Sequence, residues 1–263
     1  MDRPLARQHR SAFTVVELVA VIALVALWAA VLLPALAKAK PSNQSVQCRN
    51  NVRQLARAWS MYAADNNDIL LSSGYVAART NWVAGYLDFS SNPSNWDITR
   101  DIVNSPIWPY LGSNGPTFRC PSDPSTVMLS GQRKPRVRSY SMSHVFGSGN
   151  WLPWPFWRVY AKLSEIIVPA NTFVFLDEHS DSINDGQFAN AMSADRIVDF
   201  PGSFHYNGGC GIAFADNHAE THDWLGSRIR PPYRGNGNLV LNVTSGDSAA
   251  DVSWLAQNTT VAR

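Results

Sequence analysis

The segment 177–186, Asp-Glu-His-Ser-Asp-Ser-Ile-Asn-Asp-Gly, places many oxygen donors in one turn directly after a predicted strand over residues 172–176. Carboxylate and amide oxygens are the ligands that calcium prefers. The candidate ligands are Asp177, Asp181, Asn184 and Asp185. The spacing differs from the D-x-[DN]-x-[DN]-G calcium loop, and Asp, Asn and Gly also form ordinary turns. The segment is therefore either a calcium site or a turn without a metal.

A second set of ligand-type side chains follows a predicted tight turn at Asp216-Asn217, where Asn tolerates the positive φ that a hairpin needs. On the predicted strand 218–224, alternate side chains point to the same face. The ligand-type residues on this face are His218, Glu220 and His222. If the loop that carries His205 folds back, the four residues form a site for zinc or another transition metal. The alternative is a polar hairpin face in contact with solvent.

The chain has three cysteines, Cys48, Cys120 and Cys210, and no C-x-x-C pair. At most one intramolecular disulfide can form, and an exported protein is in a compartment that permits it. We predict a Cys48–Cys120 bridge, which would close a loop of about 72 residues and contribute about 4 kcal/mol in the chain-entropy model. Cys210, between two glycines, is then expected to be a free and buried thiol.

Charge is distributed unevenly along the chain. Residues 1–40 hold five Lys and Arg against two acids, whereas residues 41–263 hold 17 against 18. A near-neutral body gives no electrostatic footprint for nucleic acid, so we expect no nucleic-acid partner. We expect the one basic cluster to be a solvated loop; its residues are Arg133, Lys134, Arg136 and Arg138.

Residues 1–12 form a short basic leader, and residues 13–37 are almost entirely apolar. As a helix the apolar run would span about 37 Å, enough to cross a bilayer. Basic residues before it predict a single-pass inner-membrane protein with a cytoplasmic N-terminus and a periplasmic body. Glu17 lies inside the run, where an acid is unfavourable by about 2.5–3.5 kcal/mol near the membrane centre. It should either have a partner or reach outward to the interface.

The sequence Phe13-Thr14-Val15-Val16-Glu17-Leu18 after a basic leader, with Pro34 further on, resembles the N-terminal signature of type IV pilins and type II secretion pseudopilins. The resemblance implies a prepilin peptidase that cleaves between Ala12 and Phe13 and methylates Phe13. It also implies an inner-membrane assembly platform, other pilin or pseudopilin subunits as partners, and a helical filament that can become extracellular. In such a filament, Glu17 would neutralise the new amino group of a neighbouring subunit. Ala12 departs from the Gly that usually precedes the cut.

Three further motifs resemble pilin-type proteins of planctomycete and verrucomicrobial bacteria. They are Cys-Arg-Asn-Asn-Val-Arg-Gln-Leu at 48–55, Phe-Arg-Cys-Pro-Ser-Asp at 118–123, and the pair of His205 with Asp216-Asn217. The C-terminal signature of those proteins is a His, nine residues and then Asp-Gly. Here ten residues separate His205 from Asp216, and Asn217 replaces the Gly. This resemblance indicates the class of protein and no mechanism.

The predicted architecture is α+β and pilin-like: a leader over 1–12, a membrane and polymerisation helix over 13–37, a helical stalk over 38–66 and a globular body over 67–263. Within the stalk, Pro41-Ser42-Asn43 can stop or re-cap the helix, and one apolar stripe recurs at 4-3-4-3 spacing. The stripe consists of Cys48, Val52, Leu55, Trp59 and Tyr62. Antiparallel strands are predicted over 139–142, 172–176, 211–215, 218–224 and 239–243.

We expect a structural filament subunit that is not an enzyme. The alternative is a filament-tethered binding module, an adhesin or a cargo or glycan receptor, for which Trp151, Trp154 and Trp157 offer aromatic surface. A membrane-anchored metal-dependent enzyme is a third hypothesis, and it would be built on His205, Asp216, His218 and His222. The sequence shows no nucleophile-and-base arrangement and no Gly-rich phosphate loop to support it.

Overall fold

The structure is a computed structural model that describes residues 14–152 and 156–263, without the side chains of 31–42 in helix α1. It divides into two compact units, Met1–Lys40 and Pro41–Arg263, which are described separately. Residues 41–65, predicted as part of the stalk, belong to the same unit as the body. The predicted cleavage junction at Ala12 and Phe13 lies outside the described residues.

Helix α1 runs without interruption from Val15 to Asp65. Pro41-Ser42-Asn43, which can stop or re-cap a helix, does neither here, because a proline removes one backbone hydrogen bond from a helix without preventing the turns on either side from forming. In the first unit, every side chain from Thr14 to Ala30 is exposed except the half-buried Ala29. Among the residues searched, the helices do not include one with the length and hydropathy to span a membrane.

A capping box begins α1. Thr14 donates from its backbone N–H and its hydroxyl to Glu17 Oε2 (both 2.9 Å), and the Glu17 N–H donates back to Thr14 Oγ1 (3.3 Å). This reciprocal pair satisfies amide groups that have no partner inside the helix. Glu17 therefore has a local structural role in addition to any role in assembly.

In the second unit, α1 buries the predicted stripe. Cys48, Val52, Leu55 and Trp59 are fully buried, and Tyr62 packs against the same core. The helix ends after Asp65 because Asn67 and Asp68 take left-handed φ angles of 54° and 70°, as polar turn residues can.

A five-stranded sheet forms the centre of the body, in the order β5-β3-β4-β7-β8. All its pairings are antiparallel except β3 with β5. Its strands are β3 (Tyr140–Ser143), β4 (Phe173–Asp177), β5 (Gln187–Phe188), β7 (Gly209–Phe214) and β8 (Ala219–Asp223). Two small sheets pair β1 (Thr126–Leu129) with β2 (Gln132–Pro135), and β6 (Arg196–Ile197) with β9 (Val243–Thr244). The α+β class is confirmed.

The remaining helices are short. The α-helices are α2 (Pro93–Trp96) and α3 (Ala249–Gln257). The 3₁₀ helices are η1 (Pro109–Leu111), η2 (Gly115–Phe118), η3 (His144–Phe146), η4 (Leu163–Glu165), η5 (Pro169–Asn171) and η6 (Gly246–Ser248).

Four of the predicted strands match β3, β4, β7 and β8 within one or two residues. The predicted turn at Asp216-Asn217 joins β7 to β8, and Asn217 has a φ of 72°. The fifth prediction, over 239–243, is wrong except at its last residue. The alternating Leu and Val there are typical of a strand, but pairing with β6 begins only at Val243.

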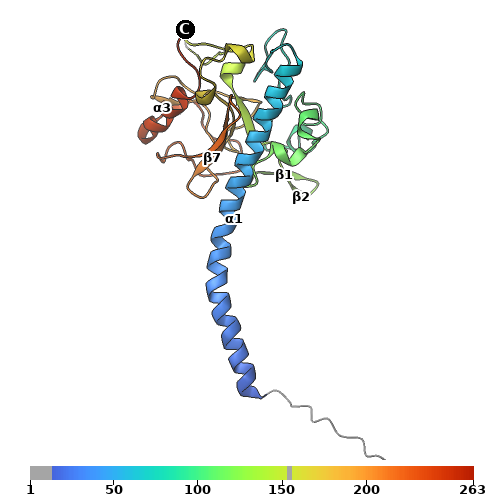
Figure 1. Cartoon of the computed structure of the whole chain (residues 1–263), viewed down its shortest axis with the longest axis vertical. Coiled ribbons are helices and arrows are strands. Elements are labelled where there is room, and N and C mark those ends of the chain that lie inside the picture. Colours follow the sequence, from blue (N-terminus) through green and yellow to red (C-terminus); the bar gives the residue numbers. More distant parts are fainter. Residues whose placement is uncertain (1–13, 153–155) are drawn as a thin grey trace, which may run out of the picture. The chain divides into compact units, whose positions relative to one another are not determined.

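Helices cover both faces of the five-stranded sheet (Figure 1). On one face, residues 48–63 of α1 share a core with Tyr140, Met142 and Phe175. On the other face, α3 contributes Val252 and Leu255 to a second core. Phe173, Leu176, Cys210, Ile212 and Phe214 are on this second face. Because side chains alternate along a strand, Cys210 and Gly211 point to opposite faces of β7.

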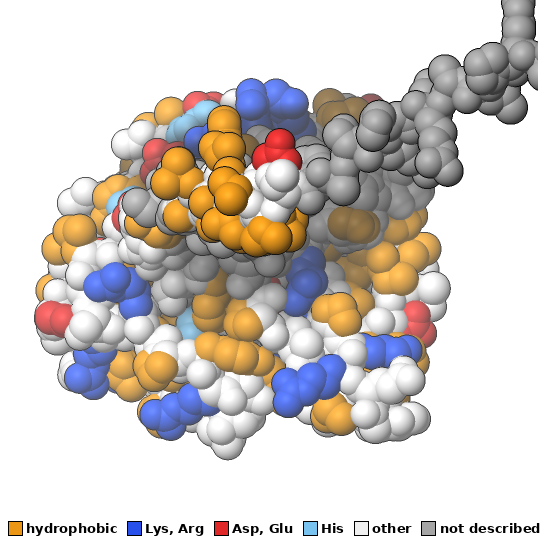
Figure 2. All heavy atoms as spheres, turned by 90° about the horizontal axis from the view of Figure 1, so that it is seen from below, with side chains coloured by type: hydrophobic (Ala, Val, Ile, Leu, Met, Phe, Trp, Pro, Cys, Tyr) orange, Lys and Arg blue, Asp and Glu red, His pale blue; other side chains and the backbone are white. Residues whose placement is uncertain are grey.

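The prediction of a solvated loop for the basic cluster is wrong, because Arg133 and Lys134 lie on strand β2 and the other two arginines are buried. Arg133 and Lys134 are not buried, but Arg136 and Arg138 are each 1% exposed. Their guanidinium groups donate to the Ser180 and Asp185 carbonyls and stack on aromatic rings, which replaces the water they lose. On the face in Figure 2, the described Lys and Arg side chains lie in separate groups among hydrophobic and uncharged ones.

Candidate metal centre

Four side chains with metal-ligating atoms meet inside the body: Cys48, Cys120, Asp177 and His205. Their ligand atoms all lie within 4.8 Å of one another, and all four residues are buried. The shortest separations join Cys120 Sγ to His205 Nε2 (3.4 Å), His205 Nε2 to Asp177 Oδ2 (3.7 Å) and Cys48 Sγ to Asp177 Oδ2 (3.8 Å). Among the described residues this is the only such group of His, Cys, Asp and Glu side chains. We call it the Cys₂AspHis cluster.

Each member of the Cys₂AspHis cluster comes from a different segment. Cys48 is on the buried stripe of α1, and Cys120 follows η2. Asp177 is the last residue of β4, on the same face as Phe175 by strand alternation. His205 is in the loop before β7, and a turn that ends at Gly208 (φ 74°) brings it back over the sheet.

Neighbouring groups hold these side chains in place. The Tyr140 hydroxyl donates to Cys48 Sγ (3.2 Å). The Cys120 N–H donates to Ser139 Oγ (3.1 Å), and the Ser139 hydroxyl donates in turn to Asp123 Oδ2 (2.7 Å). This chain of bonds fastens the loop that carries Cys120 to the start of β3.

Two glycines leave the space that the cluster needs. A Cβ on Gly202 would lie 2.8 Å from Asp177 Cγ, and a Cβ on Gly211 would lie 3.1 Å from Cys48 Sγ and 3.0 Å from Val52. Both positions are closer than real Cβ contacts normally allow. Glycine at these two positions therefore lets Asp177 and α1 approach the sheet.

The cluster contains acids and no cation. Burial raises the pKa of Cys48 and raises the pKa values of Cys120 and Asp177 well above their usual ranges. Burial lowers the pKa of His205 to about 4, so its imidazole is neutral at pH 7. The close approach of His205 and Asp177 is therefore not an ion pair. Asp177 Oδ1 and His205 Nδ1 are buried without a hydrogen-bond partner.

This arrangement has two chemical outcomes. Two thiols, an imidazole and a carboxyl can bind a transition metal, or the two thiols can be oxidised to a disulfide. The structure brings Cys48 and Cys120 together, as the disulfide prediction requires, but both are free thiols, and so is the buried Cys210. The sulfurs of Cys48 and Cys120 lie in one cluster with the imidazole of His205 and the carboxyl group of Asp177, so each sulfur has other neighbours besides the second sulfur.

The proposed calcium ligands are not gathered at one point. Asp177 belongs to the Cys₂AspHis cluster, whereas Asp181 accepts four backbone N–H groups from residues 234–237 at 2.7–3.2 Å. Asn184 Oδ1 accepts the N–H of Asp185, and Asp185 Oδ1 accepts the N–H of Gln187. These oxygen atoms stabilise turns, as the alternative interpretation of the segment expects.

The predicted histidine face is also divided. His205 points into the Cys₂AspHis cluster, while His218 is partly exposed, pairs with Asp216 (Nδ1 to Oδ1, 2.5 Å) and stacks on Phe214. His222 stacks on Trp254, with ring centroids 3.7 Å apart. Glu220 lies between them on β8, opposite Ile212. Among the described residues, these side chains form no metal-ligand group with His205.

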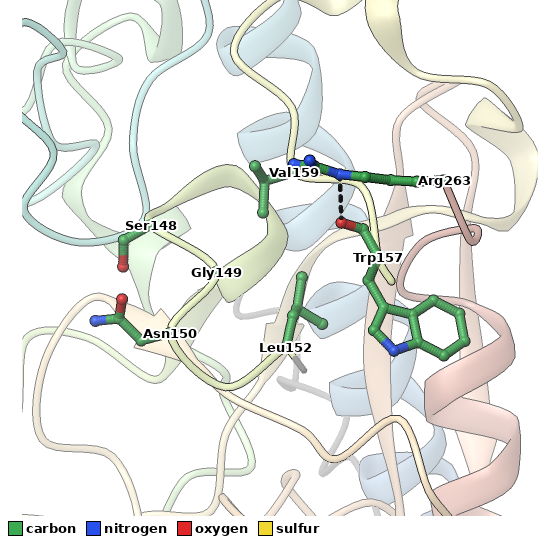
Figure 3. A pocket seen from close by; sticks show the side chains of 7 residues that line it. All are labelled: Ser148, Gly149, Asn150, Leu152, Trp157, Val159 and Arg263. Atoms are coloured by element: carbon green, nitrogen blue, oxygen red, sulfur yellow. Dashed lines mark hydrogen bonds between the residues drawn. The ribbon is translucent and has the colours of Figure 1, made fainter. Parts of the chain in front are cut away.

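The proposed aromatic surface lies partly within a separate hollow. Trp157 lines a cavity of about 320 Å³ with Leu152, Val159 and Arg263, and Trp154 lies outside the described residues. In Figure 3, the Trp157 indole points away from Ser148 and Asn150 on the opposite wall. Trp151 is 46% exposed and does not line this cavity.

Every member of the Cys₂AspHis cluster was a candidate from sequence, but in three different sites. The sequence hypotheses missed that these residues converge, because successive members are 28 to 72 positions apart along the chain and no local spacing connects them. One signal was available. Cys48 is on the predicted apolar stripe of the helix, and Asp177 directly follows the predicted strand over 172–176.

Comparison of the chain with models of protein families, with curated proteins and with solved structures finds no match.

Proposed function

We propose that this chain is a structural subunit, a pseudopilin or minor pilin, of a type II secretion or type IV pilus-like assembly. The observation that carries the proposal is the first part of α1, where large apolar side chains are exposed all around the helix. Val16 is 78% exposed, Leu27 is 67% exposed and Trp28 is 64% exposed. A helix that is apolar on all sides requires partner helices or lipid around it.

Burial of that surface supplies the driving force for assembly. Removal of apolar surface from water contributes about 25 cal/mol per Å², so the packing of many such side chains against sibling helices favours a filament strongly. The subunit needs no catalytic residue for this role. The partners in the proposal are other pilin or pseudopilin subunits and an inner-membrane assembly platform.

Processing and membrane insertion are part of the proposal and rest on the sequence alone. A prepilin peptidase would cleave between Ala12 and Phe13 and methylate the new amino group. Before assembly, the apolar run over 13–37 would lie in the inner membrane, with the body on the periplasmic side. The N-terminal residue of the mature protein, determined by mass spectrometry, tests this step.

Glu17 allows the charge to be tested separately from the helix cap. In the proposed filament its carboxylate pairs with the Phe13 amino group of a neighbouring subunit, and it also closes the capping box with Thr14. Gln at this position preserves a capping box but carries no charge. We expect Glu17→Gln to insert and fold normally but to enter filaments at least about tenfold less, since a buried amine would lose its counter-charge.

The matched control is Thr14→Ala, which removes the Thr14 hydroxyl that caps the Glu17 N–H and retains the charge. It should assemble at close to the normal level. Pull-down of tagged filaments and quantification of the incorporated subunit provide the measurement. Normal incorporation of Glu17→Gln, with loss in Thr14→Ala, would show that Glu17 acts only as a cap and would contradict the proposal.

A further inference from the structure

We propose that the Cys₂AspHis cluster is a structural Zn²⁺ site that fastens residues 41–65 of α1 to the sheet of the body. Four buried ligand atoms from four separate segments converge within 4.8 Å. This inference does not depend on the proposed role in a filament.

The distances fit tetrahedral zinc. Zn–S bonds of about 2.3 Å and Zn–N or Zn–O bonds of about 2.0–2.1 Å separate four tetrahedral ligands by about 3.3–3.8 Å. Three of the six observed separations fall in this range, at 3.4 Å for Cys120 to His205, 3.7 Å for His205 to Asp177 and 3.8 Å for Cys48 to Asp177, and all six are at most 4.8 Å. Only small side-chain shifts are needed to centre an ion.

The ligand types select zinc. Calcium and magnesium prefer oxygen ligands and larger coordination numbers, which two thiolates and an imidazole do not provide. Structural zinc sites are four-coordinate and use Cys, His and Asp side chains. With two thiolates and one carboxylate, the site would carry three negative charges against the two positive charges of the ion. Zinc binding therefore releases the protons of both thiols and of Asp177, and the ion compensates two of the three negative charges, while Asp177 Oδ1 has no hydrogen-bond partner within the fold.

The surroundings of the ligands suit a metal. The Tyr140 hydroxyl donates to Cys48 Sγ, and a hydrogen bond from the Ser122 backbone N–H favours the Cys120 thiolate. Both interactions stabilise negative sulfur, as outer-shell donors do at metal sites. A hollow of about 270 Å³, lined by His205, Asn207 and Asp223, opens beside the cluster.

The third cysteine provides an internal control. Cys210 is as buried as the other two, but it lies on the α3 face of the sheet with Ile212 and Phe214. It is outside the ligand group. A nonspecific affinity of thiols for zinc would include Cys210, whereas the proposed site excludes it.

The experiment uses the full chain purified in mild detergent, reduced, stripped with a chelator and then incubated with one equivalent of Zn²⁺. We expect about one Zn²⁺ per chain by mass spectrometry of metals, and Co²⁺ in its place should give the visible absorption of a tetrahedral thiolate complex. Zinc should raise the thermal midpoint by on the order of 10 °C. Asp177→Asn and Cys120→Ser should lower zinc affinity at least about tenfold, and Cys210→Ala should retain it.

Gly202→Ala keeps all four ligands and displaces one of them, because its Cβ would meet the Asp177 carboxylate at 2.8 Å. This substitution should lower the affinity for zinc about 10- to 100-fold. The matched control is Gly74→Ala, where only the flexible end of Gln187 is near. The proposal is overturned if the reduced wild-type chain takes up no zinc, or if Cys210→Ala loses as much zinc as Cys120→Ser. A Cys48–Cys120 disulfide in protein isolated under native conditions, without zinc, would also overturn it.

Discussion

Asp177 and Asp181, four residues apart, have opposite surroundings. Both are buried, yet Asp181 accepts four backbone N–H groups, while Asp177 faces two thiols and an imidazole. Burial raises the pKa of Asp181, but the four amides outweigh that effect and the pKa is lowered. At Asp177, burial has no comparable opposition, and the pKa is raised well above its usual range.

The difference indicates what each carboxylate is for. A buried carboxylate surrounded by N–H donors is complete within the fold, and its function is to hold the loop over 234–237. The buried carboxyl of Asp177 has the weak thiol donor of Cys48 at Oδ2 and no hydrogen-bond partner at Oδ1, and such groups are rare unless a ligand satisfies them. Substitutions at Asp181, His144 and Asp177 test this distinction.

Asp181→Ala should lower the free energy of unfolding by about 4 kcal/mol, because four backbone N–H groups lose a charged acceptor. Asp181→Asn retains one acceptor oxygen and should lose roughly half as much. Urea unfolding at pH 7 gives both values. A loss below about 0.5 kcal/mol in Asp181→Ala would mean that the loop does not depend on this carboxylate.

His144 shows the effect of burial on the pKa of a histidine that does not belong to the cluster. It is a fully buried histidine outside the Cys₂AspHis cluster, and burial lowers its pKa to about 4, although Asn190 acts in the opposite direction. In the unfolded chain the imidazole takes up a proton near pH 6.5. Its contribution to stability is therefore complete above about pH 6.5 and is lost as the pH falls toward 4, by at most about 3 kcal/mol.

His144→Gln should flatten this part of the pH dependence. The measurement is urea unfolding of both proteins between pH 7.5 and 4.5, with a chelator present so that metal-linked protons do not contribute. Equal slopes in the two proteins would contradict the assignment.

The effect of Asp177→Asn on stability should change sign when zinc is added. With a chelator present, the amide removes a buried acid and can donate to a neighbouring sulfur or imidazole, so the variant should match or exceed the wild type by about 1 kcal/mol. With zinc, the wild type should be the more stable protein. Thermal unfolding in the two conditions tests this change of sign. If the same protein is the more stable one in both conditions, the proposed difference between Asp177 and Asp181 is wrong.

Structural elements that depend on neighbouring residues could be predicted from the sequence. The stripe that contains Cys48, Val52 and Trp59 identified the buried face of α1, because helical periodicity is a property of neighbouring residues. The Asp216-Asn217 turn was also identified, because the left-handed φ depends on residue type. The burial of Arg136 and Arg138 was not, since it depends on carbonyls and rings from distant segments.

The convergence of the four residues of the candidate metal centre depends on the tertiary structure. The sequence identified Cys48 and Cys120 as a pair, Asp177 as an oxygen ligand and His205 as a nitrogen ligand, each in a separate hypothesis. Packing of α1 on one face of the sheet, at the close approach that Gly211 permits, brings the four together. Ligand geometry is a relation between atoms far apart along the chain. The residue types therefore determined which chemistry was available, and the packing of helix on sheet decided where it could occur.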